Sequence, residues 1–391
     1  MQVLFERKGY VMLMKFALRN YKNFKDEIMI DFVNVAGYQF STDCIADGVI
    51  AKMLIYGRNA TGKTNLGRAI MDIGSTMFSG SGYVGNGVFL NADSKENSAG
   101  FTYTFDFDGT ELTYQYTRFS NQELREEELI INGVSIFKCD FFNREYHFDN
   151  LKCVDAETAS VERYLQALEG DEENAENVEP KLPFLRWLIS NVALKNDSVL
   201  IRLGNYVRRM IMITVGNEMP YRVRRMGNSF YDSLEKPERL KDLEDFLNAM
   251  GIECRLILKK LPDGQKELYF AHEKLVPFYE NASSGTLALV DLYRRLIPKV
   301  WDASLVYLDE FDAFYHYETA EIIVKAINDN KNMQAIVTSH NTYLMKNAIT
   351  RPDCCFILSN NKITSLCDST LKEIREAHNL EKMYRNGAFT E

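Results

Sequence analysis

Alternating apolar and polar residues mark much of the first 150 residues as antiparallel strands. The alternating segments are residues 15–21, 28–32, 101–107, 112–118 and 130–136. Asp108-Gly109 separates two of these segments and Asn132-Gly133 interrupts another, and both dipeptides favour the tight turns of β-hairpins. The pattern therefore predicts an antiparallel β-meander within residues 76–150.

Helical periodicity dominates the middle of the chain, and helices alternate with strands towards its end. Residues 156–215 are helical in character, and residues 234–250 form an amphipathic helix that precedes a hairpin turning at Pro262-Asp263-Gly264-Gln265. The later elements are helix 285–298, strand 304–308, helix 318–328, strand 334–338, helix 342–348 and strand 354–358. Such alternation is typical of a parallel α/β sheet.

An apolar run at residues 52–56 supplies one more strand of that α/β sheet, far from the others in the chain. The core is therefore split, with about residues 75–270 inserted between its halves. The predicted segments are a first half of the core (15–75), a β-rich lobe (76–150), an inserted helical region (151–250) and the second half of the core (251–391). Residues 1–14 are a disordered leader or follow an upstream start, and the sequence does not decide between the two.

Composition places the chain among globular proteins that build a core. Of its 391 residues 46% are hydrophobic, and the formal net charge is −9. The 7 cysteines, none in a C-x-x-C spacing, are expected to be buried free thiols in the reducing cytoplasm. No run of 18 apolar residues occurs, so no membrane span is expected.

A cluster of arginines is the exception to the acidic balance. Dedicated nucleic-acid binders are usually basic, although a local basic patch on an acidic protein can still serve. The cluster is either an ordinary solvated face or a surface for nucleic acid or an acidic partner. Its members are Arg202, Arg208, Arg209, Arg222, Arg224 and Arg225.

One short motif carries the strongest chemical signal. Gly57, Arg58, Asn59, Ala60, Thr61, Gly62, Lys63 and Thr64 form a complete G-x-x-x-x-G-K-[ST] phosphate-binding loop. The loop follows the strand 52–56 and precedes a helical stretch, as the motif requires. Its backbone N–H groups would surround the phosphates, Lys63 would reach the β- and γ-phosphates, and Thr64 would bind Mg²⁺. The chain is therefore predicted to bind ATP or another nucleoside triphosphate.

A pair of carboxylates ends the predicted strand 304–308. We assign Asp309 to Mg²⁺ and Glu310 to the attacking water, because a phosphate-loop enzyme needs one acid for each task. An isolated pair of acids at a strand end could simply be solvated. The preceding phosphate loop favours the catalytic interpretation.

Further motifs follow in an order that resembles the ATP-binding-cassette ATPases. Ser283, Ser284 and Gly285 stand at a helix start before the acidic strand, Asp312 follows the acids, and a buried strand ends at His340. These match the family's signature, its Asp loop and its switch histidine, and the resemblance covers almost the whole chain from Lys15. The implied fold is an α/β phosphate-loop ATPase head with an N-terminal antiparallel β-meander lobe and an inserted helical region.

The opening strand, Lys15 to Phe24, and Asn65 directly after Gly-Lys-Thr look like the SMC, RecF and OLD branch of that family. The runs 309–316 and 377–389 resemble the compact OLD-like ATPases of bacterial anti-phage defence systems. Two features depart from the pattern. No glutamine lies between Gln39 and Gln115, where the family's Gln loop is expected, and the signature is Ser283-Ser284-Gly285 rather than the longer transporter form, which is common in this branch. A long heptad stretch is also absent, so no SMC-type coiled coil is expected. About fifty residues follow His340, so no nuclease module is expected.

The resemblance implies a homodimer with two composite ATP sites. Ser284 and the N–H groups near Gly285 of one subunit would cap ATP held by the phosphate loop of the other, with Ser283 and Asp312 nearby. His340 would contact the γ-phosphate. The expected output is regulation of a separately encoded effector in anti-phage defence. The alternative is a RecF- or SMC-like ATPase that binds DNA in repair or recombination, and a scaffold with negligible turnover is disfavoured by the Asp309-Glu310 pair.

Overall fold

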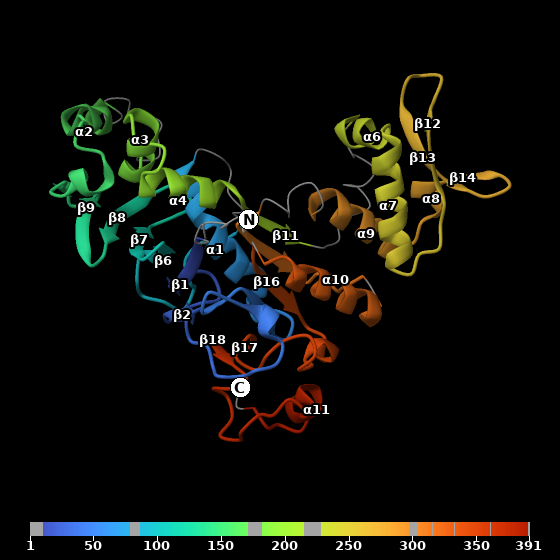
Figure 1. Cartoon of the computed structure of the whole chain (residues 1–391). Coiled ribbons are helices and arrows are strands. Elements are labelled where there is room, and N and C mark those ends of the chain that lie inside the picture. The colour runs from blue at the N-terminus through green and yellow to red at the C-terminus, as the bar shows by residue number, and fades with distance from the viewer. Residues whose placement is uncertain are drawn as a thin grey trace, which may run out of the picture.

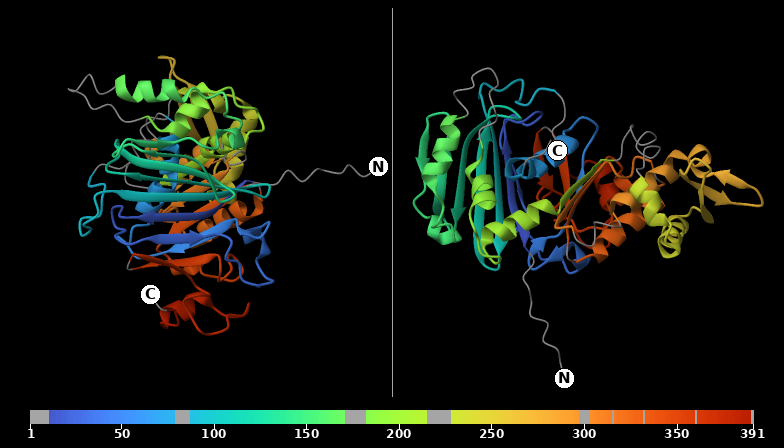
Figure 2. Two further views of the ribbon diagram at one scale, coloured as in Figure 1. Left: turned by 90° about the vertical axis from the view of Figure 1, so that its left-hand side faces the viewer. Right: turned by 90° about the horizontal axis from the view of Figure 1, so that it is seen from above.

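The computed structural model describes residues 11–78, 87–170, 182–214, 228–296, 303–314, 316–331, 333–359 and 361–389. Two large β-sheets dominate it, with helix α1 (Lys63–Met77) between them and a smaller three-stranded sheet standing apart (Figures 1 and 2). One large sheet is an antiparallel lobe and the other is the α/β core. The predicted fold class is therefore confirmed.

The antiparallel lobe is a seven-stranded sheet in the order β10-β9-β8-β7-β6-β1-β2. Its strands are β1 (Met12–Arg19), β2 (Ile28–Asp31), β6 (Ala99–Phe107), β7 (Thr110–Arg118), β8 (Leu124–Ile131), β9 (Val134–Asp140) and β10 (Glu145–His147). The residues of both predicted turns, Asp108-Gly109 and Asn132-Gly133, have positive φ angles, as two-residue hairpins require. The meander is confirmed, and the pair β1–β2 joins it through β6.

The core is a six-stranded sheet in the order β11-β15-β16-β5-β17-β18. Its strands are β5 (Lys52–Tyr56), β11 (Met210–Thr214), β15 (Leu305–Asp309), β16 (Gln334–Ser339), β17 (Cys355–Ser359) and β18 (Lys362–Ser365). The first five in this order run parallel, and β18 is an antiparallel edge strand. Every residue of β5, β15 and β16 is buried, which explains why each strand contains a run of consecutive apolar residues rather than an alternating pattern.

Strand β11 corrects the prediction that residues 156–215 are helical and that residues 75–270 lie outside the core. Met210–Thr214 pairs with β15 in parallel register and belongs to the core sheet. Around it the predicted helical region does contain helices: α2 (Val161–Gly170), α3 (Phe184–Asn191), α4 (Val199–Arg208), α6 (Asn228–Leu234) and α7 (Pro237–Ala249). The predicted helix 342–348 was also wrong, because this stretch forms a short 3₁₀ turn at Thr342–Leu344.

Helix α1 is fixed on both sides, and this fixes the phosphate loop that precedes it. On the core side the Tyr307 hydroxyl donates to the carbonyl of Lys63 at 2.6 Å, and a Cβ at Gly67 would collide with the Tyr307 ring. On the lobe side Tyr103 donates to the carbonyl of Ala69 at 2.6 Å. Asp72 accepts a hydrogen bond from Tyr116, and Arg118 lies 3.3 Å from its carboxylate. The two sheets therefore hold one helix in a single position.

Helix α3 is attached to the lobe through a buried carboxylate. Glu127 on β8 accepts hydrogen bonds from the Tyr114 hydroxyl at 2.7 Å and from the backbone N–H of Phe184, the first residue of α3. Burial raises the pKa of Glu127 to about 7, and the hydrogen bonds to its carboxylate oppose that rise. The carboxylate thus satisfies a helix N-terminal N–H group that would otherwise be buried without a partner.

The remaining elements complete the second half of the chain. The small sheet consists of β12 (Leu256–Lys260), β13 (Lys266–Ala271) and β14 (Leu275–Pro277). The core sheet separates it from the antiparallel lobe, which lies on the other side of the molecule (Figure 1). Helices α8 (Phe278–Asn281), α9 (Ser284–Leu296), α10 (Tyr317–Asp329) and α11 (Leu380–Arg385) follow. In the described part of the chain the longest helix, α1, has 15 residues, and no helix there is long and apolar enough to span a membrane.

Candidate nucleotide site

The phosphate loop, residues 57–62, connects the buried strand β5 to α1 in a conformation that only glycine permits at two positions. A Cβ at Gly57 would lie 2.9 Å from the carbonyl oxygen of Leu358, which is backbone and cannot move aside. Gly62 has a φ of 103°, and a Cβ there would lie 3.0 Å from the Phe24 ring. The glycines of the motif are therefore required by the loop geometry itself.

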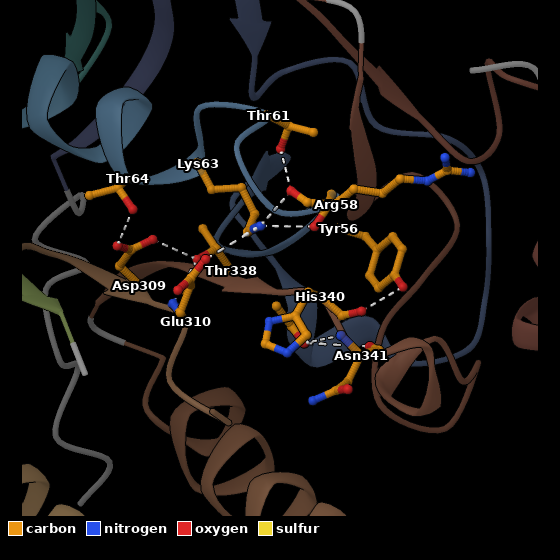
Figure 3. A network of polar contacts seen from close by, with 12 residues as sticks. Tyr56, Arg58, Thr61, Lys63, Thr64, Asp309, Glu310, Thr338, His340 and Asn341 are labelled. Atoms are coloured by element: carbon orange, nitrogen blue, oxygen red, sulfur yellow. Dashed lines mark hydrogen bonds and ion pairs between the residues drawn. The ribbon is translucent and has the colours of Figure 1, made fainter. Parts of the chain in front are cut away.

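Lys63 is turned back onto the loop that it follows (Figure 3). Its Nζ donates to the carbonyl oxygens of Gly57 at 2.8 Å and Arg58 at 3.0 Å, and lies 3.6 Å from Oε1 of Glu310. The Lys63 side chain is 2% exposed, so its charge is almost completely shielded from solvent. This arrangement favours an anion at the loop, because a buried ammonium group is stabilised by negative charge.

A hydroxyl–carboxylate hydrogen bond also joins the acidic strand to the phosphate-loop motif. The Thr64 hydroxyl donates to Oδ2 of Asp309 at 2.7 Å, although the two residues are separated by 245 positions in the sequence. Oδ1 of the same carboxylate accepts from Thr338 at 2.9 Å. Burial raises the pKa of Asp309, while the hydrogen bonds from Thr64 and Thr338 oppose that rise. Asp309 is completely buried, so its orientation is set by these two hydroxyls.

The donor atoms in this contact fit Mg²⁺. The Thr64 hydroxyl and an Asp309 carboxylate oxygen are hard oxygen ligands, which Mg²⁺ prefers, and they already lie within hydrogen-bonding distance of each other. Mg²⁺ is usually held by one or two protein oxygens together with substrate phosphates and water. The structure therefore brings together Lys63, Thr64, Asp309 and Glu310 as the sequence predicted.

His340 and Asp312 lie beside these four residues. Hydrogen bonds connect Asp312 to Ser339 and Asn341, the two sequence neighbours of His340. Tyr56 donates to the carbonyl of His340 at 2.6 Å (Figure 3). Oδ2 of Asp312 accepts from Ser339 at 2.6 Å and from Asn341 at 2.9 Å. Nδ1 of His340 and Oδ1 of Asp312 are buried and have no hydrogen-bond partner among the residues that the structure describes. Because buried polar atoms rarely lack partners, both atoms are suited to a ligand or to a rearranged loop.

The signature residues form a helix start on another part of the core. The Ser283 hydroxyl accepts from the backbone N–H of Thr286 at 3.1 Å, which caps α9. Ser284 is exposed, so its hydroxyl is accessible. A Cβ at Gly285 would lie 2.8 Å from the carbonyl of Phe314, so glycine is needed where α9 approaches the segment after Asp312. The signature roles of these three residues remain predictions.

Asn23 and Phe24 contact the site, although the sequence motifs had given neither residue a role in it. The side-chain amide of Asn65 donates to Asn23, and Gly62 packs against Asn23 and Phe24. The Asn23 side chain therefore braces the loop from the antiparallel lobe. It lies in the opening segment that carries the resemblance, and that was the signal that could have identified it.

Thr214 ends strand β11, and its Cα is paired with that of Asp309. Thr214 therefore lies beside the acidic pair, at the carboxyl edge of the sheet where α/β proteins bind ligands. The family's Gln loop was expected between α1 and the meander, and residues 79–86 of that stretch lie outside the described residues.

The arginine cluster is partly engaged within the chain. Arg202 pairs with Asp108 at 2.7 Å, and the guanidinium of Arg208 lies 4.3 Å from the centre of the Phe78 ring. Arg209 donates to the carbonyl of Asn205. The other three arginines, Arg222, Arg224 and Arg225, lie outside the described residues. A nucleic-acid surface here remains a prediction.

Family comparison gives the class of the protein. The site and the sheet order define a phosphate-loop ATPase of the α/β type. Residues 52–346, most of the chain, match the family described as "AAA domain, putative AbiEii toxin, Type IV TA system", and the chain belongs to this family. Membership confirms the predicted relationship to AAA-type phosphate-loop ATPases, which the resemblance of the sequence motifs had assigned to the SMC, RecF and OLD branch. No curated protein matches the chain.

The chain is also similar to solved SMC head domains, each at 16% sequence identity. An SMC head bound to the C-winged helix domain of ScpA covers 92% of this chain and 98% of its own, with a TM-score of 0.47. An SMC head with an extended coiled coil, bound to the C-terminal domain of ScpA derived from Pyrococcus furiosus, covers 91% and 96% with a TM-score of 0.45. The SMC head domain from Thermotoga maritima covers 90% and 98% with a TM-score of 0.41. These similarities concern the overall fold.

Proposed function

We propose that this protein binds ATP with Mg²⁺ at the phosphate loop and hydrolyses it. The contact that carries this proposal is the 2.7 Å hydrogen bond between Thr64 and Asp309, with the Lys63–Glu310 ion pair at 3.6 Å beside it. It unites the loop that would hold phosphates with the two acids that would hold a metal ion and direct water. Four groups of the right chemistry thus converge from two distant parts of the chain.

Each residue has a defined task in the proposed reaction. The N–H groups of residues 57–62 and the N-terminus of α1 would bind the phosphate oxygens, and Lys63 would exchange its carbonyl partners for them. Mg²⁺ held by Thr64 and Asp309 would neutralise charge on the β- and γ-phosphates. Glu310 would accept the proton of the attacking water, and His340 would contact the γ-phosphate.

We propose that two subunits share each ATP. The exposed Ser284 and the N-terminal N–H groups of α9 would cap the nucleotide held by the partner subunit's phosphate loop, and the reciprocal contact would form at the second site. The γ-phosphate contacts would then favour the closed dimer, and hydrolysis would remove them. ATP binding and turnover would in this way switch the association of the subunits.

Purified protein should release phosphate from ATP in a Mg²⁺-dependent reaction, and Lys63→Ala should reduce the rate about 100-fold or more, since a preorganised charge at the reacting phosphate is lost. The assay is steady-state phosphate release, with thermal unfolding to show that the variant is folded. Lys331→Ala, which removes a lysine whose side chain is 75% exposed, is the matched control and should be unaffected. Equal rates for wild type and Lys63→Ala would refute the proposed activity.

We propose further that this ATPase regulates a separately encoded effector in anti-phage defence. Support comes from the family description, which names a toxin–antitoxin system, and from the resemblance of the runs 309–316 and 377–389 to defence ATPases.

A strain that carries Lys63→Ala with its neighbouring genes intact should lose protection against phage, because the nucleotide state could no longer control the effector. Plating efficiency on a phage panel measures this, and a strain with Lys331→Ala should remain protected. Unchanged protection in the Lys63→Ala strain would contradict the regulatory role. It would not bear on the ATPase activity, which the phosphate-release assay tests separately.

A further inference from the structure

Thr338 lies in the core sheet directly beside the acidic pair, and the proposed reaction gives it no role. It is the fifth of six residues in β16, between β15 and β5, and it is completely buried. The parallel ladder between β15 and β16 ends at the pair Leu308–Val337. Asp309, the last residue of β15, and Glu310 after it therefore have no ladder partner in β16.

Beyond the end of this ladder, the Thr338 hydroxyl forms hydrogen bonds with both acidic residues. Oγ1 of Thr338 donates to Oδ1 of Asp309 at 2.9 Å and accepts from the backbone N–H of Glu310 at 2.9 Å (Figure 3). The other oxygen of Asp309 is held by Thr64. Glu310 has a φ of 46°, a left-handed conformation that residues other than glycine seldom adopt. The hydroxyl thus fixes both the Asp309 carboxylate and the unusual main-chain turn that aims Glu310.

We propose that Thr338 is a positioning residue for ATP hydrolysis, holding the metal-binding carboxylate of Asp309 and the main chain of Glu310 in one relative geometry. This inference rests on the proposed ATPase function. Thr338 would contact neither nucleotide nor water. It would act through its hydrogen bonds, in the way that outer-shell partners orient the ligands of a metal ion.

Thr338→Val tests this proposal because valine keeps the shape of the side chain and removes the hydroxyl. We expect kcat to fall about 10- to 100-fold, the usual effect of losing an outer-shell partner. Affinity for ATP measured without metal should stay unchanged, since no phosphate contact is lost. Mn²⁺ binding in the presence of a non-hydrolysable ATP analogue, followed by electron paramagnetic resonance, should weaken about tenfold. Thr338→Ser should restore both kcat and Mn²⁺ affinity.

Thr104→Val is the matched control, because it removes a strand threonine hydroxyl that bonds Thr113 at 3.0 Å in the antiparallel lobe. It should leave kcat and Mn²⁺ binding unchanged. Thr338→Ala is made in parallel, so that the test survives if the valine variant does not fold.

The proposal is overturned if a folded variant without the hydroxyl binds Mn²⁺ and hydrolyses ATP like wild type. It is also overturned if Thr338→Ser is as impaired as Thr338→Val. Absence of hydrolysis by wild type would instead refute the proposed function. The Mn²⁺ measurement would still report on Thr338 in that case, so the two failures are distinguishable.

Discussion

Glu310→Gln should bind ATP and Mg²⁺ but hydrolyse ATP at least about 100-fold more slowly than wild type, because a general base contributes about 10²–10⁴-fold to a rate. Glutamine has a side chain of the same length as glutamate and should keep the left-handed main-chain conformation of residue 310. It cannot accept a proton from water. The change also removes the ion pair with Lys63 at 3.6 Å, which leaves the lysine freer to engage phosphate. The variant should therefore accumulate in its ATP-filled state.

Light scattering of Glu310→Gln with and without ATP and Mg²⁺ measures this accumulation. We expect the mass to rise from that of one 45.1 kDa chain to twice that value only when both ligands are present. Glu373→Gln, at an exposed position, is the control and should hydrolyse ATP like wild type. Normal turnover by Glu310→Gln would refute the assignment of Glu310. A constant dimer would place the switch inside a preformed assembly, and a constant monomer would contradict the shared ATP site.

The sequence predicted the parts of the site that local patterns encode. The phosphate loop has a fixed spacing, and the acids end an apolar strand, so Lys63, Thr64, Asp309 and Glu310 could be assigned without knowing which strands pair. The meander could be predicted in the same way, because a half-buried strand alternates between apolar and polar residues. Asp-Gly and Asn-Gly mark its turns, since these dipeptides readily adopt the positive φ angles of a tight hairpin. Each of these signals is contained within a few consecutive residues and does not depend on contacts with distant parts of the chain.

The sequence did not reveal features that depend on distant contacts. Strand β11 is five residues long, follows a helix directly and is partnered by a strand almost a hundred residues further on. A short buried parallel strand does not alternate, so nothing local separates it from a helix. Thr338 looks like any β-branched residue in a strand, and its role becomes visible only when β15 lies beside it.

The predicted helix 342–348 shows the opposite error, in which tertiary contacts override a local tendency. The side-chain amide of Asn347 donates to the carbonyls of Arg375, Glu376 and His378, which ties this stretch to the segment before α11. The stretch forms a 3₁₀ turn over three residues and continues as irregular chain. Helix propensity is a weak prior where such contacts form.

A mixture of two inactive variants should recover ATPase activity if each site is built from two subunits. Ser284→Arg places a long side chain at an exposed helix start, so it should block the cap on the partner's ATP without disturbing the core. Lys63→Ala removes the phosphate contact of its own subunit. In a mixed dimer one site then combines the intact phosphate loop of the first variant with the intact signature of the second, while the other site carries both defects.

Each variant alone should be nearly inactive, and an equimolar mixture should recover about one quarter of the wild-type rate, since half of the dimers are mixed and each has one intact site of two. Phosphate release from the mixture is compared with that of Lys63→Ala mixed with Glu310→Gln. That control mixture should stay inactive, because both of its changes lie on the phosphate-loop side of a site. Recovery in the first mixture alone would establish that Ser284 acts on the partner's nucleotide. If the first mixture stays inactive although the subunits exchange, each site must be formed within one chain, and the signature role of Ser284 would be refuted.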